Sequence, residues 1–238
     1  MEPPRYLNLL RSPTEPPFTF INPPFDFNAK VLAQYPPEVT GIHLLNSMCR
    51  RLGWGSLAGK RLLDYGCGVR FARTIVNLDM EIGCYTGVDV NRKSISWLQE
   101  HVKDRRLRFV NVDLHHPIYN PNGVAARDHR ALARLDLADF DAICMFSVVT
   151  HMDPDETQLI LTMLQACVPV GGALYFTAFV EENVQSYAER DPQKPRILST
   201  YHPEFLVSLV EQCGWEVSAM YAKTALQQTA FVCRKRDT

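Results

Sequence analysis

The sequence predicts an α/β fold in which a mostly parallel β-sheet is covered by helices on both faces. Two observations favour it. Short apolar segments typical of buried strands alternate with segments of helical period from residue 60 to residue 179. The last two apolar segments, 215–222 and 229–235, leave no room for a helix between them, so at least one of these strands runs antiparallel. The chain has 238 residues, 46% of them hydrophobic, which is enough to bury one substantial core.

The expected elements follow one another in a regular order. Residues 37–52 predict an amphipathic helix, because their apolar side chains recur every three or four positions. We then expect strands at residues 60–66, 84–90, 107–114, 141–149 and 172–179, and helices at 70–79, 92–102 and 155–168. A helix at 203–214, ended by Gly214, precedes the final pair of strands.

The first 36 residues form a separate region, and we expect the main domain to cover 37–238. Nine of the 16 prolines lie before residue 38, which excludes regular helix or central strand from much of this stretch. Six large apolar side chains nevertheless favour packing against the body of the protein. They are Phe18, Phe20, Ile21, Phe25, Phe27 and Tyr35. Two interpretations stay open for this arm: a structural strap, and a lid over a ligand site.

Composition excludes several classes of protein. The formal net charge of -1 gives no overall attraction to nucleic acid or to an anionic membrane. We expect no membrane helix, since no apolar stretch approaches about 20 residues, and the N-terminus does not resemble a secretory signal. The seven cysteines form no CxxC pair and are odd in number, which favours reduced thiols and a cytoplasmic location.

Aspartates follow three neighbouring strands of the expected sheet. Asp64, Asp89 and Asp113 fall at the carboxyl ends of these strands, where open α/β sheets bind ligands. Gly66 and Gly68 free the backbone after the first strand for close approach of a ligand. A carboxylate beside that turn would repel a pyrophosphate. The pattern therefore favours a cationic nucleoside such as S-adenosylmethionine over a dinucleotide.

The second and third aspartates suit particular parts of such a nucleoside. Asp89 lies where a carboxylate can accept hydrogen bonds from both ribose hydroxyls. Asp113 can accept from the exocyclic amine of adenine. Each aspartate alone would also fit a helix cap or a turn. That interpretation explains less well why an aspartate follows each of three neighbouring strands.

The motifs "RLLDYGCGVRF", "YTGVDVNRKSI", "RFVNVDL", "DAICMFSVVTHM" and "VPVGGALYFTAF", in this order, resemble the class I S-adenosylmethionine-dependent methyltransferases. The resemblance covers about residues 58–234 and implies a Rossmann-like three-layer sandwich, whose seven-stranded sheet ends in an antiparallel hairpin. It implies S-adenosyl-L-methionine as cofactor and S-adenosyl-L-homocysteine as product. The implied cofactor contacts are Asp64, Gly66, Cys67 and Gly68 for the methionine part, Asp89 for the ribose, Asp113, Leu114, Val90 and Asn91 for the adenine, and Phe146 with Ser147 beneath the sulfonium.

One residue departs from the family pattern. The family often has a third glycine two residues after Gly68, where this chain has Arg70. An arginine there can bind the methionine carboxylate, or it can crowd the pocket and weaken binding. We include Arg70 among the cofactor-binding residues because the other motifs are undamaged.

Methyl transfer needs alignment and exclusion of water, and it requires no metal. If the acceptor is a hydroxyl, a general base helps, and His151 is the candidate catalytic residue, just beyond the fourth strand and before a helix that Asp153 caps. The alternative is that this loop only shapes the pocket. His115, His116 and His202 are further histidines near the same edge. An amine, thiol or carbanion acceptor would need no base.

We expect an acceptor site built from the arm and from residues 115–136 and 180–203. A small-molecule acceptor, with oxygen preferred, fits the neutral charge better than nucleic acid. The rival interpretations are a methyltransferase acting on protein or nucleic acid, a nonenzymatic S-adenosylmethionine-binding protein, and a nicotinamide-dependent oxidoreductase. Asp64 and the final hairpin count against the last.

Overall fold

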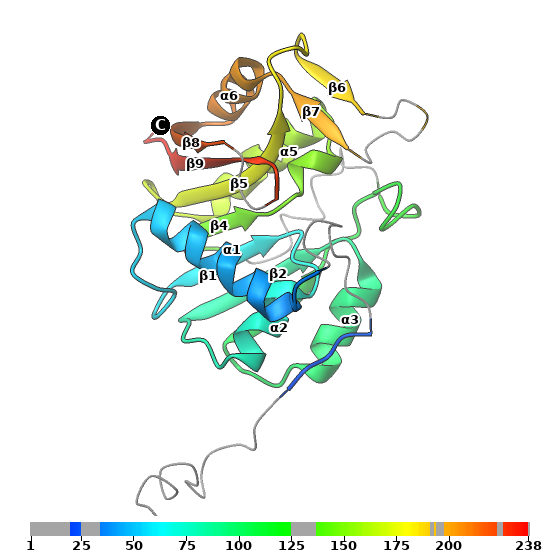
Figure 1. Ribbon diagram of the computed structural model, residues 1–238, viewed down its shortest axis with the longest axis vertical. Helices are drawn as coiled ribbons and strands as arrows, with labels where there is room; N and C mark the ends of the chain where they lie inside the picture. The colour runs from blue at the N-terminus through cyan, green and yellow to red at the C-terminus, as the bar shows by residue number, and fades with distance from the viewer. Residues whose placement is uncertain are drawn as a thin grey trace, which may run out of the picture.

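The computed structural model describes residues 20–24, 34–124, 137–190, 193, 198–222 and 226–237. In these residues one sheet of nine strands carries the fold (Figure 1). The strands are β1 (Arg61–Tyr65), β2 (Cys84–Asp89), β3 (Leu107–Asn111), β4 (Ala142–Met145), β5 (Ala173–Val180), β6 (Tyr187–Glu189), β7 (Ser199–Tyr201), β8 (Trp215–Tyr221) and β9 (Thr229–Lys235).

The sheet has the predicted mixed topology. Strands β3, β2, β1, β4 and β5 lie side by side in this order and are parallel. Strand β9 pairs antiparallel with both β5 and β8, so the C-terminal hairpin closes this side of the sheet. These seven strands confirm the predicted sheet. The short strands β6 and β7 are an addition that the sequence analysis missed; β7 pairs with the end of β5 at Phe179 and Val180.

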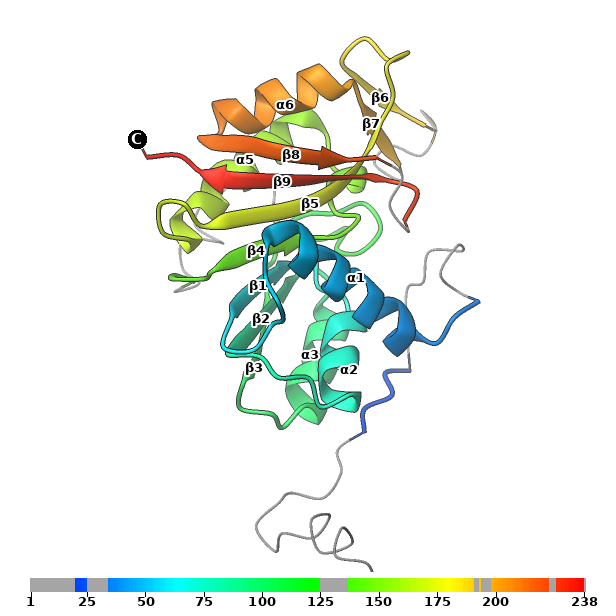
Figure 2. The same cartoon turned by 60° about the vertical axis from the view of Figure 1, so that its left-hand side comes forward.

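Helices cover both faces of the sheet and give three layers (Figure 2). The helices are α1 (Pro37–Leu52), α2 (Arg70–Asn77), α3 (Arg92–His101), α5 (Pro154–Leu164) and α6 (Pro203–Gln212). The first three share one apolar core with one face of the sheet, and α5 and α6 share a second core with the other face. Successive strand residues alternate between the two cores: Leu62 lies in the first and Leu63 in the second.

Local signals explain where several helices begin and end. Helix α1 begins with proline and ends at Gly53, which has the left-handed φ of 74° typical of a helix stop. Asp153 caps α5 as predicted, since its side chain accepts a hydrogen bond from the backbone N–H of Glu156 (2.8 Å). Between β4 and α5 the chain forms the 3₁₀ helix η2 (Val149–His151), so the fourth strand is shorter than predicted.

Ile21 of the arm contacts the body of the protein. Ile21 is buried, and its backbone N–H and C=O form hydrogen bonds with the side chain of Asn77 at the end of α2 (2.8 and 3.0 Å). Phe20 and Tyr35 are each about half exposed. Phe18, Phe25 and Phe27 lie outside the described residues.

Candidate functional site

A cavity of about 840 Å³ lies at the carboxyl ends of β1, β2 and β4. This is the ligand edge that the topology of an open α/β sheet predicts, and the volume is in the range of small-molecule sites. Most predicted site residues line it: Asp64, Gly66, Cys67, Gly68, Arg70, Asp89, Val90, Asn91, Leu114, Phe146, Ser147 and His151.

The glycine turn between β1 and α2 forms one wall of this cavity. The backbone N–H groups of Gly66 and Cys67 donate to the carbonyl of Val88 (2.7 and 3.1 Å), which holds the turn against β2. Gly66 has φ 78°, and a Cβ there would lie 2.4 Å from a methyl group of Val148. No other residue type fits this position without displacing Val148.

Asp64 is a buried carboxylate at the base of the turn. The Tyr85 hydroxyl donates to its Oδ2 (2.6 Å) and the Cys144 thiol to its Oδ1 (3.4 Å), and the side chain is only 2% exposed. Burial raises the pKa of Asp64 to about 7, against which the two hydrogen bonds act, while the nearby Asp89 adds to the rise. A cationic group in the cavity would favour the ionised form of this carboxylate.

Asp89 ends β2 and is held by the backbone. Its Oδ2 accepts from the N–H of Gly68 (2.8 Å) and its Oδ1 from the N–H of Asn91 (2.7 Å). Burial raises the pKa of Asp89, and these N–H groups oppose that rise. Because a carboxylate has about four acceptor sites, Asp89 can accept further hydrogen bonds from a ligand while its orientation stays fixed.

Asp113, which we predicted at this edge, lies outside the described lining of the cavity. Strand β3 ends at Asn111, two residues earlier, so Asp113 lies beyond the sheet. Its side chain is exposed and accepts from Nδ2 of Asn120 (3.1 Å), and it is not among the described residues that line the cavity. Leu114, which is buried and lines the cavity, takes its place there.

Ser147 forms the cavity floor after β4, in a strained backbone conformation with φ 59°. Its N–H donates to Oγ1 of Thr177 (2.8 Å), and its hydroxyl accepts from Nε2 of Gln228 (2.9 Å). Gln228 is buried and comes from the turn between β8 and β9. The sequence predicted this turn only as a connection between two strands. The adjacent glutamines Gln227 and Gln228 were the signal that could have indicated a role in the cavity.

His151 lies in the cavity within an aromatic cluster. Its ring centroid is 6.1 Å from that of His116 and 6.2 Å from that of Tyr119, both of which line the cavity. Nδ1 of His116 accepts from the backbone N–H groups of Ile118 and Tyr119 (3.2 Å each). Neutral His116 therefore carries its proton on Nε2. His202 precedes α6 and is not among the described residues lining the cavity.

The wall beyond β4 includes Arg190, which belongs to the segment 180–203 that we expected at the acceptor site. Phe179 at the end of β5 and Arg190 after β6 line the cavity, and the Arg190 guanidinium lies 4.9 Å from the Phe179 ring centroid. An ion pair of 3.7 Å joins Arg190 to Glu181, but both side chains are about half exposed. Such a pair contributes little stability.

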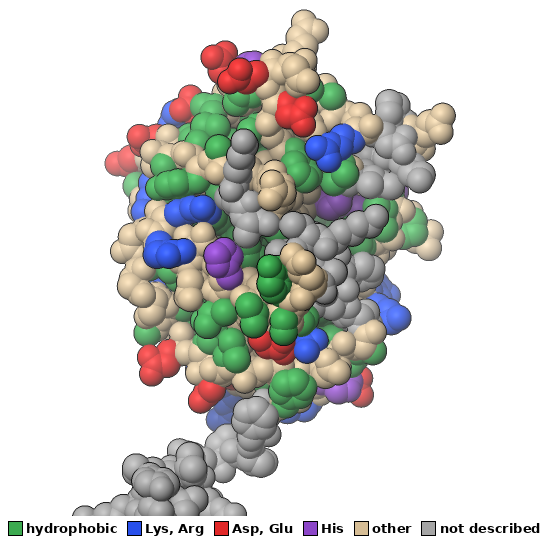
Figure 3. All heavy atoms as spheres, viewed as in Figure 1, with side chains coloured by type: hydrophobic (Ala, Val, Ile, Leu, Met, Phe, Trp, Pro, Cys, Tyr) green, Lys and Arg blue, Asp and Glu red, His purple; other side chains and the backbone are tan. Residues whose placement is uncertain are grey.

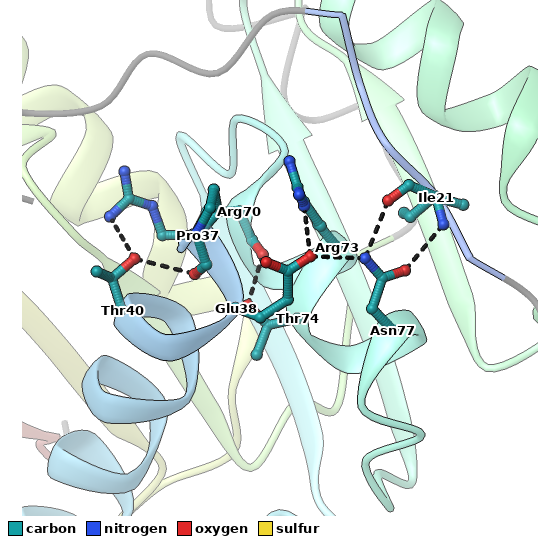
Figure 4. A network of polar contacts seen from close by, with 8 residues as sticks. All are labelled: Ile21, Pro37, Glu38, Thr40, Arg70, Arg73, Thr74 and Asn77. Atoms are coloured by element: carbon teal, nitrogen blue, oxygen red, sulfur yellow. Dashed lines mark hydrogen bonds and ion pairs between the residues drawn. The ribbon is translucent and has the colours of Figure 1, made fainter. Parts of the chain in front are cut away.

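Arg70 begins α2 and also lines the cavity. Its Nη1 donates to Oγ1 of Thr40 in α1 (3.2 Å), as Figure 4 shows. The side chain thus lies along the wall between α1 and α2, where Thr40 holds its guanidinium.

Comparison with known proteins identifies the family. A family model described as a methyltransferase domain matches residues 43–219, well over half of the chain. This protein is a class I S-adenosylmethionine-dependent methyltransferase. The match includes the glycine turn, Asp64, Asp89 and His151.

Solved structures share the fold of this methyltransferase at low sequence identity. Magnesium protoporphyrin IX methyltransferase from Synechocystis PCC 6803, with bound SAM, is 13% identical, with a TM-score of 0.53 over 83% of this chain and 79% of that one. A 1,6-didemethyltoxoflavin-N1-methyltransferase from Burkholderia thailandensis is 18% identical, with a TM-score of 0.58 over 87% and 82%. The [4+2]-cyclase SpnF is 16% identical, with a TM-score of 0.58 over 82% of each chain. The fold alone therefore does not fix the reaction.

The cavity of the methyltransferase fits the cofactor of its family. A side chain added at Gly68 would meet no atom within 4 Å, so the turn leaves open space beside Asp89.

The described residues contain no helix long and apolar enough to cross a membrane. The same residues hold no group of three or more His, Cys, Asp or Glu side chains that could bind a metal ion.

Proposed function

We propose that this methyltransferase transfers a methyl group from S-adenosylmethionine to a small-molecule acceptor, with an oxygen acceptor preferred. The observation that carries the proposal is the cavity itself, in which Asp64, Asp89 and the glycine turn lie on one side of β4 and His151 at its end. The carboxylates suit a positively charged nucleoside, and an imidazole suits a hydroxyl that must lose a proton.

We assign the cofactor contacts as follows. Asp64 and the turn Gly66, Cys67 and Gly68 hold the amino-acid part together with Arg70; Asp89 holds the ribose; Val90, Asn91 and Leu114 contact the adenine; Phe146 and Ser147 form the floor beneath the sulfur. When bound, the cofactor supplies a methyl group already activated by positive sulfur. The protein contributes alignment and exclusion of water.

His151 is the proposed general base. Of the two histidines in the aromatic cluster, His116 has Nδ1 occupied by two backbone N–H groups, and its neutral form offers only a donor at Nε2. His151 is therefore the better candidate for accepting the acceptor's proton, with His116 and Tyr119 fixing the surrounding wall.

A small molecule is favoured by the shape and charge of the protein. The cavity volume suits a cofactor and a small acceptor. On the face drawn in Figure 3, lysine and arginine side chains are scattered among acidic, polar and apolar ones, unlike the continuous basic surface of a nucleic-acid-binding protein. We also propose a cytoplasmic location, because all seven cysteines are free thiols.

Calorimetry tests the cofactor assignment. S-adenosylhomocysteine should bind the protein and a nicotinamide dinucleotide should not; binding of the dinucleotide alone would refute the assignment.

A screen of small hydroxylated, amino and thiol compounds with labelled S-adenosylmethionine tests the acceptor. The His151→Gln variant should transfer methyl groups to a hydroxyl acceptor much more slowly than the unaltered protein, while the affinity of the variant for S-adenosylhomocysteine stays unchanged. An equal rate in the variant would rule out His151 as the base.

A further inference from the structure

The short hairpin of β6 and β7 lies at the carboxyl end of β5 (Figure 2). Strand β7 pairs with Phe179 and Val180 of β5, and β6 pairs antiparallel with β7. Arg190 directly follows β6, and its backbone N–H donates to the carbonyl of Leu198 (2.9 Å), which continues the hairpin beyond β6. Arg190 and Leu198 both line the cavity. The hairpin thus supplies part of the cavity wall.

A buried tyrosine connects this hairpin to the loop that carries His151. The hydroxyl of Tyr201 in β7 donates to the carbonyl of Met152, the residue after His151 (2.8 Å). Tyr201 is fully buried, and its ring centroid is 5.2 Å from that of Tyr187 in β6. The 3₁₀ helix η2 also packs against β5 and β7. Arg190 and the proposed base are therefore carried by elements that pack directly on one another.

The guanidinium of Arg190 keeps its capacity to bind an anion. It lies 4.9 Å from the ring centroid of Phe179, and such a cation–π contact leaves its N–H donors to other partners. The ion pair with Glu181 spans 3.7 Å, which is longer than a hydrogen bond, and both side chains are about half exposed. Because a pair of this kind is weak, a ligand anion can replace Glu181 at little cost.

The charged side chains along the cavity indicate what Arg190 binds. Among the described lining residues the carboxylates are Asp64, Asp89 and Glu156, and the arginines are Arg70 and Arg190. Arg70 belongs to the proposed cofactor site, so Arg190 is the arginine left for the acceptor. A negative group on the acceptor would be repelled by the carboxylates and attracted by Arg190. Guanidinium is also the side-chain group best shaped to bind a carboxylate.

Apolar and aromatic side chains share this part of the cavity with Arg190 and His151. They are Tyr119, Met152, Ile160, Phe179 and Leu198. Walls of this composition favour an aromatic or otherwise apolar ligand body, which a few polar groups then orient. The polar groups available for this purpose are the guanidinium of Arg190 and the imidazole of His151.

We propose that the acceptor is a hydroxylated aromatic acid whose carboxylate is bound by Arg190 while its hydroxyl faces His151. This inference rests on the proposed function and names the acceptor class. The hydroxyl oxygen forms the new bond to the methyl carbon as the carbon–sulfur bond breaks, the sulfur keeps that electron pair in S-adenosylhomocysteine, and His151 takes the hydroxyl proton. Arg190 contacts the acceptor and determines specificity, and it takes no part in the proton transfer.

Pairs of compounds that differ in one charge test the acceptor class. Hydroxybenzoates and hydroxycinnamates are the acids, and the corresponding amides are neutral compounds of nearly the same shape. By calorimetry on the complex with S-adenosylhomocysteine, at least one acid should bind roughly 10- to 100-fold more tightly than its amide, as expected for a charged hydrogen bond. Labelled S-adenosylmethionine should methylate that acid at its hydroxyl.

Three variants separate binding by Arg190 from a structural role. Arg190→Gln should bind the acid and its amide equally and keep its affinity for S-adenosylhomocysteine. Glu181→Gln should bind the acid more tightly, because the anion that competes for Arg190 is removed. Arg236→Gln is the matched control and should keep the preference for the acid. Arg236 forms a similar half-exposed ion pair with Glu211 (3.3 Å) and is not among the described residues that line the cavity.

Other outcomes overturn the inference. If Arg190→Gln keeps the preference for the acid, another group binds the carboxylate. If Glu181→Gln loses acid binding as Arg190→Gln does, the ion pair supports the wall and the arginine is structural. If no acid binds better than its amide, the acceptor is not an acid of this class. In each case the proposed function stands when the unaltered protein binds S-adenosylhomocysteine and methylates a neutral hydroxyl compound, and it fails when neither occurs.

Discussion

Asp89 and Asp113 provide a test at the scale of single residues. Asp89→Ala should weaken S-adenosylhomocysteine by about 1–3 kcal/mol, the usual cost of leaving a buried polar group without its partner. Asp113→Ala should leave the affinity unchanged, because Asp113 is exposed and outside the cavity. Calorimetric titration of both variants measures the difference. Equal affinities for the two variants would mean that the ribose does not lie at Asp89.

The buried carboxylate of Asp64 predicts a pH dependence of stability. Its pKa is about 7 in the folded protein, against an ordinary value of 3.8. Between about pH 4 and 7 the folded state thus keeps a proton that the unfolded chain has lost. The stability contributed by this group is complete below about pH 4 and is lost as the pH rises through 7.

Denaturant unfolding of the ligand-free protein measures this effect. The free energy of unfolding should fall more steeply between about pH 4 and 7 in the unaltered protein than in Asp64→Asn, which has no proton to lose. Parallel pH profiles for the two proteins would show that Asp64 is ionised in the fold throughout this range.

The contact between α1 and α2 is a test at the scale of elements. Gly41→Ala should lower the free energy of unfolding by about 1–3 kcal/mol, because its methyl group collides with Thr74 and overpacking outweighs the gain in helix propensity. Gly55→Ala is the control, since a Cβ there meets no atom within 4 Å. Denaturant unfolding compares the two. A loss confined to Gly55→Ala, or no loss in either, would contradict this packing.

Elements with a strong repeating signal could be predicted from the sequence. The five parallel strands and the helices between them are apolar runs and helical periods of useful length, and the final hairpin follows from a connection too short for a helix. Strands β6 and β7 were missed because each has three residues, too few for a periodic pattern to emerge.

The errors in the site come from boundaries and from long-range contacts. Asp113 was placed at the ligand edge because the third strand was expected to reach residue 114, whereas its pairing with β2 ends at Asn111. Gln228 reaches the cavity from a segment far along the chain from the glycine turn. No local pattern reports such contacts, since sheet order, not sequence distance, determines them.

The whole molecule includes part of the arm, although the sequence suggested a boundary at residue 37. A chain beginning at residue 25 should be less stable than one beginning at residue 20, because Asn77 loses both hydrogen bonds to Ile21 and a buried apolar side chain is removed. The expected loss is about 1–3 kcal/mol. Thermal unfolding of the two chains measures it. Equal stability would show that the contact at Ile21 contributes nothing to the domain.

Strand β9 lies between β5 and β8 but follows every other strand in the chain. During synthesis the backbone groups on this side of β5 therefore stay unpaired until the last strand is made. The nascent protein has an open sheet edge that can pair with another chain. Gln228, which supports the cavity floor, emerges just before this strand. A chain that ends before residue 228 would therefore lack both the strand that covers β5 and the glutamine that holds Ser147, and its open sheet edge would favour aggregation.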